Sequence, residues 1–72
     1  MQVNLNSVEK VKTFVNDVSR LDTDIDLVSS RYVIDAKSLM GIFSLDLSKP
    51  IKVEVCDKEK EPYVMEALKK YA

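Results

Sequence analysis

Hydrophobic and polar positions recur along the chain with two different periods, and the switches between these periods predict its elements. Val3 and Leu5 alternate with polar neighbours, which predicts a short, half-buried strand over residues 2–5. Asn6 is expected to cap a following helix, with Glu9 completing a capping box. The helical spacing of apolar residues predicts this amphipathic helix over residues 7–21; they are Val8, Val11, Phe14, Val15, Val18 and Leu21.

The middle of the chain predicts a β-hairpin and then a second helix. Residues 25–28 and 31–34 are rich in β-branched and aromatic side chains, and Ser29-Ser30 between them predicts a turn. This turn signal is weaker than Asn-Gly. Residues 38–45 predict a short helix that begins at Ser38. Its apolar residues cover more of the circumference than one core-facing stripe needs, so part of it should face water or a partner.

The last third of the chain completes a recognisable order of elements. Residues 51–55 alternate without a break and predict a strand, the charged run 57–61 predicts a solvated turn, and Pro62 suits the first position of a last helix. The inner face of that helix is expected to hold Val64, Ala67, Leu68 and Tyr71. The order β-α-β-β-α-β-α predicts an α+β fold, an open-faced two-layer sandwich with a four-stranded, largely antiparallel sheet and helices on one face. We expect one domain over residues 1–72.

The composition excludes several classes of function. The net charge is −1, and 11 basic residues are interleaved with 12 acidic ones, so no basic stripe for nucleic acid is present. No apolar run approaches the roughly 18 residues of a membrane span, and the N-terminus lacks the pattern of a signal peptide. The single cysteine, Cys56, fits a reducing compartment and is expected to be a buried or half-buried structural residue. We expect a cytoplasmic protein.

Catalytic and metal-binding patterns are missing from the sequence. The chain has no histidine, which removes the commonest general base and the commonest metal ligand. It also has no Gly-rich phosphate loop, no paired cysteines and no serine with a plausible base. Asp24 and Asp26 alternate on one strand and are expected to be exposed carboxylates. We therefore expect no enzyme activity, no metal and no cofactor.

The motif Lys37-Ser38-Leu39-Met40-Gly41, together with the order of elements, resembles HPr, the histidine-containing phosphocarrier of the bacterial sugar phosphotransferase system. That family carries a regulatory serine in a Lys-Ser-Ile-Met-Gly-like motif at the start of its second helix. The stretch 18–27 also resembles the family's passage from its first helix into its second strand. The similarity runs from about Val11 to Val55.

The family's active loop is not preserved. HPr carries phosphate on a histidine in a Gly-x-His-x-Arg-Pro-like loop before its first helix, and ungapped alignment places Ser7 at the histidine position and Glu9 at the arginine position. A serine phosphoester lacks the labile P–N bond of phosphohistidine, and Glu9 would repel phosphate where arginine would pair with it. The resemblance therefore implies an HPr-like protein without histidine phosphotransfer.

Ser38 is then the candidate phosphorylation site. The resemblance implies that an HPr kinase modifies it and that the product acts in carbon-catabolite control, through a carbon-control regulator. A serine at a helix N-cap also favours an added phosphate, because free backbone N–H groups surround it.

Helical geometry separates the apolar residues that follow Ser38 into two sets. Ile42 and Leu45 are expected in the core, whereas Leu39, Met40 and Phe43 are expected to form an exposed patch that binds partner proteins. Lys37 is a further candidate contact at this surface.

Two other interpretations stay open. Ser38 is an ordinary helix cap if the chain is a small α/β interaction module that shares only the fold. The order β-α-β-β-α-β also occurs in ferredoxin-like domains that bind small ligands. Phosphorylation of Ser38 by an HPr kinase favours the HPr-like interpretation, and micromolar binding of metabolites without a protein partner favours the ferredoxin-like one. For the HPr-like protein we expect protein partners, no nucleic acid, no membrane, and a monomer or weak dimer.

Overall fold

The first helix and its flanking strands form where the sequence predicts them, with shifted ends. The computed structural model describes residues 1–30 and 32–72, and places β1 at Gln2–Val3, α1 at Val8–Ser19 and β2 at Ile25–Ser29. Ser7 caps α1, because its Oγ accepts a hydrogen bond of 3.1 Å from the backbone N–H of Lys10. The predicted capping box of Asn6 and Glu9 is therefore wrong, and the cap lies one residue later.

The predicted hairpin is confirmed by the pairing of β2 with β3, which spans Tyr32–Asp35. Ser29 lies opposite Tyr32, and Ser30 has a φ of 53°, a left-handed conformation that is uncommon for residues other than glycine. Arg31, where the second strand of the hairpin was predicted to begin, lies outside the described residues.

The remaining elements are α2 at Leu39–Phe43, β4 at Ile51–Val55, and α3 at Glu61–Leu68, which ends in a 3-10 turn at Lys69–Tyr71. The charged run predicted as a plain turn forms a 3-10 turn at Lys58–Lys60. Asp57 caps it by accepting the N–H of Glu59 at 3.1 Å. Pro62 is the second residue of α3 and not the first. Its missing N–H still falls in the first turn, where backbone N–H groups have no partner within the helix.

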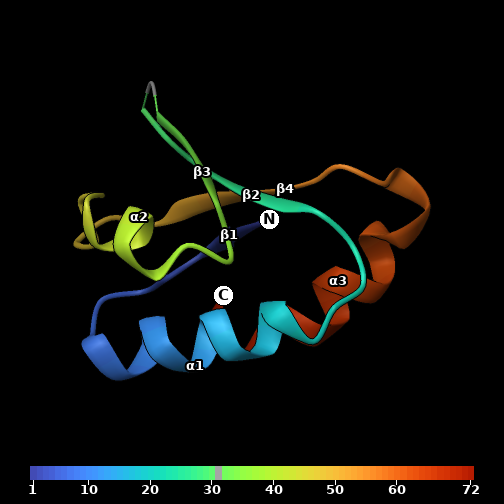
Figure 1. Cartoon of the computed structure of the whole chain (residues 1–72), viewed down its shortest axis with the longest axis horizontal. Coiled ribbons are helices and arrows are strands. Elements are labelled where there is room, and N and C mark those ends of the chain that lie inside the picture. Colours follow the sequence, from blue (N-terminus) through green and yellow to red (C-terminus); the bar gives the residue numbers. More distant parts are fainter. Residues whose placement is uncertain (31) are drawn as a thin grey trace.

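The four strands form one sheet in the order β1-β4-β2-β3, and every neighbouring pair is antiparallel. The predicted open-faced α+β sandwich is confirmed, and its sheet is antiparallel throughout. The crossover from β1 through α1 to β2 passes over β4, which lies between those strands. The crossover from β3 through α2 to β4 passes over β2 in the same way. Figure 1 shows α1 and α3 below the sheet, α2 beside it, and the β2–β3 hairpin extending beyond the helices. None of the helices in the described residues has the length and apolar character that crossing a bilayer requires.

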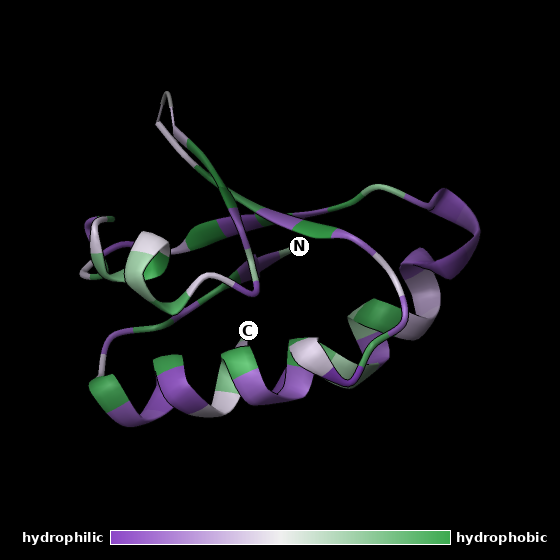
Figure 2. Cartoon of the chain, viewed as in Figure 1, coloured by the Kyte–Doolittle hydropathy of each residue, from purple (hydrophilic) through white to green (hydrophobic). Residues whose placement is uncertain are grey.

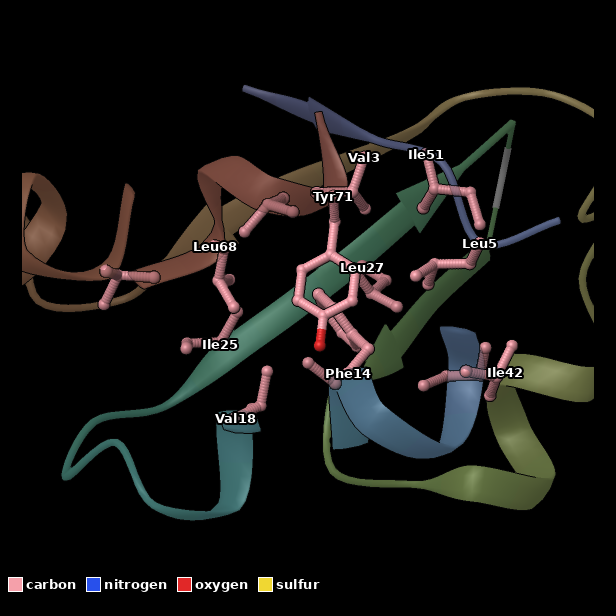
Figure 3. Packing of buried hydrophobic residues seen from close by; sticks show 14 of the residues in the cluster. Val3, Leu5, Phe14, Val18, Ile25, Leu27, Ile42, Ile51, Leu68 and Tyr71 are labelled. Atoms are coloured by element: carbon pink, nitrogen blue, oxygen red, sulfur yellow. The ribbon is translucent and has the colours of Figure 1, made fainter. Parts of the chain in front are cut away.

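The core lies between the sheet and the helices, and Tyr71 occupies its centre (Figure 3). The Tyr71 ring meets Phe14 edge to face with centroids 5.2 Å apart, and its hydroxyl donates to Asp17 Oδ2 at 2.5 Å. The backbone N–H of Asn4 donates to the Tyr71 carbonyl at 2.7 Å. The predicted inner face of the last helix is largely confirmed, with Ala67 half-buried. The buried hydrophobic residues are Val3, Leu5, Val11, Phe14, Val18, Leu21, Ile25, Leu27, Ala36, Ile42, Leu45, Ile51, Val53, Val55, Val64, Leu68 and Tyr71.

Val8 departs from its predicted place on the apolar face of α1, because it is 56% exposed. It is the first residue of α1, a helix that carries both hydrophobic and hydrophilic positions (Figure 2). Helical spacing assigns it to the same stripe as Val11, but the sheet and the other helices do not cover the first turn.

The opposite face of the sheet carries polar side chains and the exposed Val33, and none of the described helices covers it (Figure 1). Asp26 on β2 lies opposite Asp35 on one side and opposite Glu54 on the other, so three carboxylates form a row across adjacent strands. Glu54 also pairs with Lys52 at 3.3 Å. Like charges directly opposite each other in a sheet are destabilising.

Candidate functional site

The turn from β3 into α2 is held by Asp35 and presents Ser38. The Asp35 carbonyl accepts the N–H of Ser38 at 2.9 Å, and its carboxylate accepts the N–H of Lys37 at 2.8 Å. Ser38 has an extended backbone and its Oγ accepts the N–H of Gly41 at 3.1 Å. Ser38 is thus the N-cap of α2, as the sequence predicts.

Gly41 allows this helix to pack closely against the sheet. A Cβ at this position would lie 2.6 Å from Ile34 Cγ2 and 2.9 Å from Ser38 Oγ, both too close for non-bonded atoms. The absence of a side chain therefore keeps the Ser38 hydroxyl in its capping position and α2 against β3.

α2 is shorter than predicted, since it ends at Phe43 and not near Leu45. The N–H groups of Ser44 and Leu45 donate to carbonyls three residues earlier, at 3.1 and 3.0 Å, and the Ser44 hydroxyl donates to the Gly41 carbonyl at 2.5 Å. The last turn therefore tightens into 3-10 geometry. A helix this short aligns few peptide dipoles, so its field on Ser38 is weaker than that of a longer helix.

The apolar residues of α2 divide between core and solvent as predicted. Ile42 and Leu45 are buried, whereas Leu39 is 36%, Met40 80% and Phe43 39% exposed. We call Leu39, Met40 and Phe43 the α2 patch. Its exposure agrees with the sequence prediction, and its binding role stays a prediction.

Three of the predicted site residues line two separate hollows. Phe43 lines an open groove together with Ser7, so the structure brings the second helix to the position where the resemblance places the family's histidine. Lys37 lines a different, polar hollow of about 340 Å³ at the other end of the sheet. Glu9 is exposed in the first turn of α1, and the described residues that line the two hollows do not include it.

The polar hollow mixes both signs of charge. Lys60 Nζ donates to the Asp22 carbonyl at 2.6 Å, which ties the start of α3 to the turn after α1. In the described part of the chain, no group of three or more His, Cys, Asp or Glu side chains is placed to hold a metal ion. The residues that line this hollow are Asp22, Thr23, Asp24, Lys37, Cys56, Asp57 and Lys60.

Cys56 differs from its prediction, because it is exposed and not buried. Its N–H donates to the Asp24 carbonyl at 3.1 Å, and its Sγ lies 3.9 Å from Asp26 Oδ2. Partial desolvation, followed by the charges of Asp26 and Asp24, raises the pKa of the Cys56 thiol. The thiol therefore stays protonated near neutral pH and is a poor nucleophile.

Sequence reasoning missed Val8 and Leu47, which complete the groove beside Phe43 and Ser7. Periodicity placed Val8 on the apolar stripe of the first helix, and Leu47 lies in a loop where no period applies. The sequence carries no signal for this groove, because residues 6–8 and 43–48 become neighbours only when the sheet has formed.

Comparisons with known proteins identify the fold. The family model described as "PTS HPr component phosphorylation site" matches residues 9–72, a range that contains Ser38 and Glu9 but not Ser7. HPr-C-His from Thermoanaerobacter tengcongensis has 22% identity and a TM-score of 0.78, over 97% of this chain and 85% of that one. Crh, the catabolite repression containing protein of Bacillus subtilis, has 25% identity and a TM-score of 0.72, over 99% of this chain and 82% of that one. That Crh structure is described as an intertwined dimer with a swapping domain. No curated protein matches the chain.

Proposed function

The chain belongs to the HPr family, and on that premise we propose that it is a regulatory, protein-binding member that does not relay phosphate through histidine. The observation that carries the proposal is a chain without histidine in which Ser38 still caps a helix beside the exposed α2 patch. In this proposal the protein is cytoplasmic, is not an enzyme and acts by contact with other proteins.

Loss of phosphotransfer follows from the chemistry at the start of α1. Ser7 stands where the resemblance places the phosphorylated histidine, and its Oγ is engaged as the cap of α1. Glu9 brings a negative charge where the family has arginine, so a phosphoryl group arriving there would meet repulsion.

Phosphorylation of Ser38 is the proposed switch. A phosphate would add about −1.5 to −2 charges directly beside three uncharged apolar side chains. This converts the α2 patch from a neutral surface into one with an anionic border, which a basic partner can distinguish. The proposed partners are an HPr kinase that reads the serine segment and a carbon-control regulator that binds the product. The name of Crh links that protein to catabolite repression, which supports this direction.

We propose a monomer or weak dimer as the working form. β1 is only two residues long and pairs with β4 at Gln2–Lys52 and Val3–Ile51. An exchange of so short a strand would bury little surface, although Crh is described as exchanging a domain.

A kinase assay tests the proposal directly. The protein is incubated with a cognate HPr kinase and ATP, and the modified residue is mapped by mass spectrometry. One phosphate is expected on Ser38, absent from Ser38→Ala and retained in Ser44→Ala, a matched serine at the other end of the same helix. An unmodified chain at stoichiometric kinase, or a phosphate on Ser44, would overturn the proposed switch.

A further inference from the structure

An open groove of about 550 Å³ lies between the start of α1 and the segment that follows α2. Phe43 belongs both to this groove and to the α2 patch, so the two surfaces are continuous. A volume of several hundred Å³ is typical of sites that receive a bound group. The residues that line the groove are Asn6, Ser7, Val8, Phe43, Leu47 and Ser48, and we call it the neutral groove.

All six of these residues are uncharged, and the three apolar ones are accessible to different degrees. Val8 is 56% exposed, Phe43 is 39% exposed, and Leu47 is partly buried against the core. The groove therefore offers hydrophobic surface that the rest of this chain does not cover.

The two serine hydroxyls of the groove already have partners within the chain. Ser7 Oγ accepts the Lys10 N–H at 3.1 Å, and the Ser48 hydroxyl donates to Asp46 Oδ1 at 2.5 Å. The hydrogen bonds from the Ser48 hydroxyl and N–H hold the pKa of the Asp46 carboxyl below its usual value, so this carboxylate stays ionised and bound to Ser48. Both serines thus mainly fix the shape of the groove.

This chemistry decides what the groove can bind. A phosphate would give up hydration without gaining a cation, because lysines line the polar hollow and not the groove. An apolar group would gain about 25 cal/mol for each Å² removed from water. The complementary occupant is therefore uncharged and hydrophobic.

We propose that the neutral groove is the anchor site for a large apolar side chain that a partner protein inserts when it docks on the α2 patch. This inference rests on the proposed function for its partner and adds what the partner must present. Buried aliphatic or aromatic anchors in such pockets carry much of the energy of protein interfaces. In this proposal the groove beside Ser7, where the resemblance places the phosphorylated histidine, makes a hydrophobic contact with the partner.

The test uses the ¹⁵N-labelled full chain, with indole as a neutral apolar probe and inorganic phosphate as an anionic one. Indole should shift the amide signals of residues 6–8 and 43–48 and saturate with a Kd of about 1 mM or weaker, as for an isolated anchor group. Phosphate should leave these signals unchanged. Val8→Asp should weaken indole binding about fivefold or more, which corresponds to about 1 kcal/mol.

The matched control is Val33→Asp, since Val33 is also a widely exposed valine, 63%, but lies on β3. This variant should change indole affinity less than about twofold. Asp at the first position of a helix is favourable, so Val8→Asp should stay folded, and dispersed amide signals verify this.

Several results would overturn the proposal: no indole shifts up to its solubility limit, shifts centred on Tyr32 or Tyr63, or equal shifts with phosphate. A micromolar Kd for indole would assign the groove to a small molecule and overturn the protein anchor. Ser38→Ala should leave indole binding intact, so failure of the groove and failure of the phosphorylation switch are distinguishable.

Discussion

At the scale of single residues, Tyr71 and Asp17 connect the C-terminal turn to α1. The hydrogen bond from the Tyr71 hydroxyl, and then the one from Lys70, hold the pKa of the Asp17 carboxyl below its ordinary 3.8. Burial and the Asp17 contact in turn raise the pKa of the Tyr71 hydroxyl, which keeps it protonated as a donor. Each group thus stabilises the form that the other needs.

This pair predicts a specific dependence of stability on pH. Because the folded pKa of Asp17 is lowered, its contribution is complete above the unfolded pKa near 3.8 and is lost as pH falls through the lower folded value. Tyr71→Phe should therefore reduce the free energy of unfolding by about 1–2 kcal/mol at pH 7 and by less at pH 3, below the unfolded pKa. Urea unfolding at both pH values measures this, with exposed Tyr63→Phe as control. An equal loss at the two pH values would argue against the Asp17 bond as the cause.

Gly41 gives a second prediction at this scale. An added Cβ would gain about 1 kcal/mol of helix propensity but would lie 2.6 Å from a methyl of Ile34. Since overpacking costs about 1–3 kcal/mol, Gly41→Ala should lower stability. In an Ile34→Ala background the clash with Ile34 disappears but the 2.9 Å approach to Ser38 Oγ remains, so the substitution should cost less stability than it does in the parent chain. Strict additivity in this double-mutant cycle, measured by urea unfolding, would disprove the contact.

Which residue caps a helix was only partly predictable from the sequence. Ser38 follows a turn fixed by Asp35, and its cap was predicted. At α1, both Asn6 and Ser7 are suitable N-cap residues, and which of them caps the helix depends on the path of the chain after β1. Val8 was assigned wrongly for a related reason, because spacing reports which residues share a face but not whether anything covers that face.

At the scale of elements, α2 shows how far periodicity carries. The angular positions of residues around a helix correctly separated Ile42 and Leu45 from the α2 patch. The end of the helix was predicted two residues too late, because the tight last turn depends on Ser44 and its local hydrogen bonds. Strand 51–55 was predicted at its true ends, since alternation stops where β4 stops. The charged run after it has no apolar period, so its 3-10 turn could not be read from the sequence.

The two faces of α2 should respond differently to substitution. Met40→Lys changes a side chain that is 80% exposed and should alter the free energy of unfolding by less than about 0.5 kcal/mol. Ile42→Ala empties a fully buried site and should lower it by about 2–5 kcal/mol. Thermal or urea unfolding of both variants measures the difference. Similar losses in the two variants would mean that the α2 patch is part of the core.

At the scale of the whole molecule, the sequence predicted the fold because its elements are regular and their order is informative. The family match then decided between the HPr-like and ferredoxin-like interpretations. The neutral groove could not be predicted, since it joins residues 6–8 to residues 43–48 through the folded sheet. For the same reason Lys37 and Phe43, close in sequence, were expected at one surface but line different hollows.

The uncovered face of the sheet gives a prediction that involves three strands. Asp26 lies between Asp35 and Glu54, so Asp26→Asn should raise the free energy of unfolding by about 0.2–1 kcal/mol at low salt. It should also lower the pKa of the Cys56 thiol, because the Asp26 charge contributes to raising it, and so speed thiol alkylation at pH 8. Glu54→Gln, which also breaks the pair with Lys52, should stabilise less. A slower alkylation of Asp26→Asn would contradict the charge argument.

The strand order also determines when the protein can fold during its synthesis. β4 is the partner of both β1 and β2, with Gln2 opposite Lys52 and Ile25 opposite Val55. A nascent chain that has not yet released residues 51–55 from the ribosome can form α1 and the β2–β3 hairpin, but it cannot join them into one sheet. Ribosome-bound chains stalled before β4 emerges should therefore be open to proteases, and compaction should come in one late step once this strand is available.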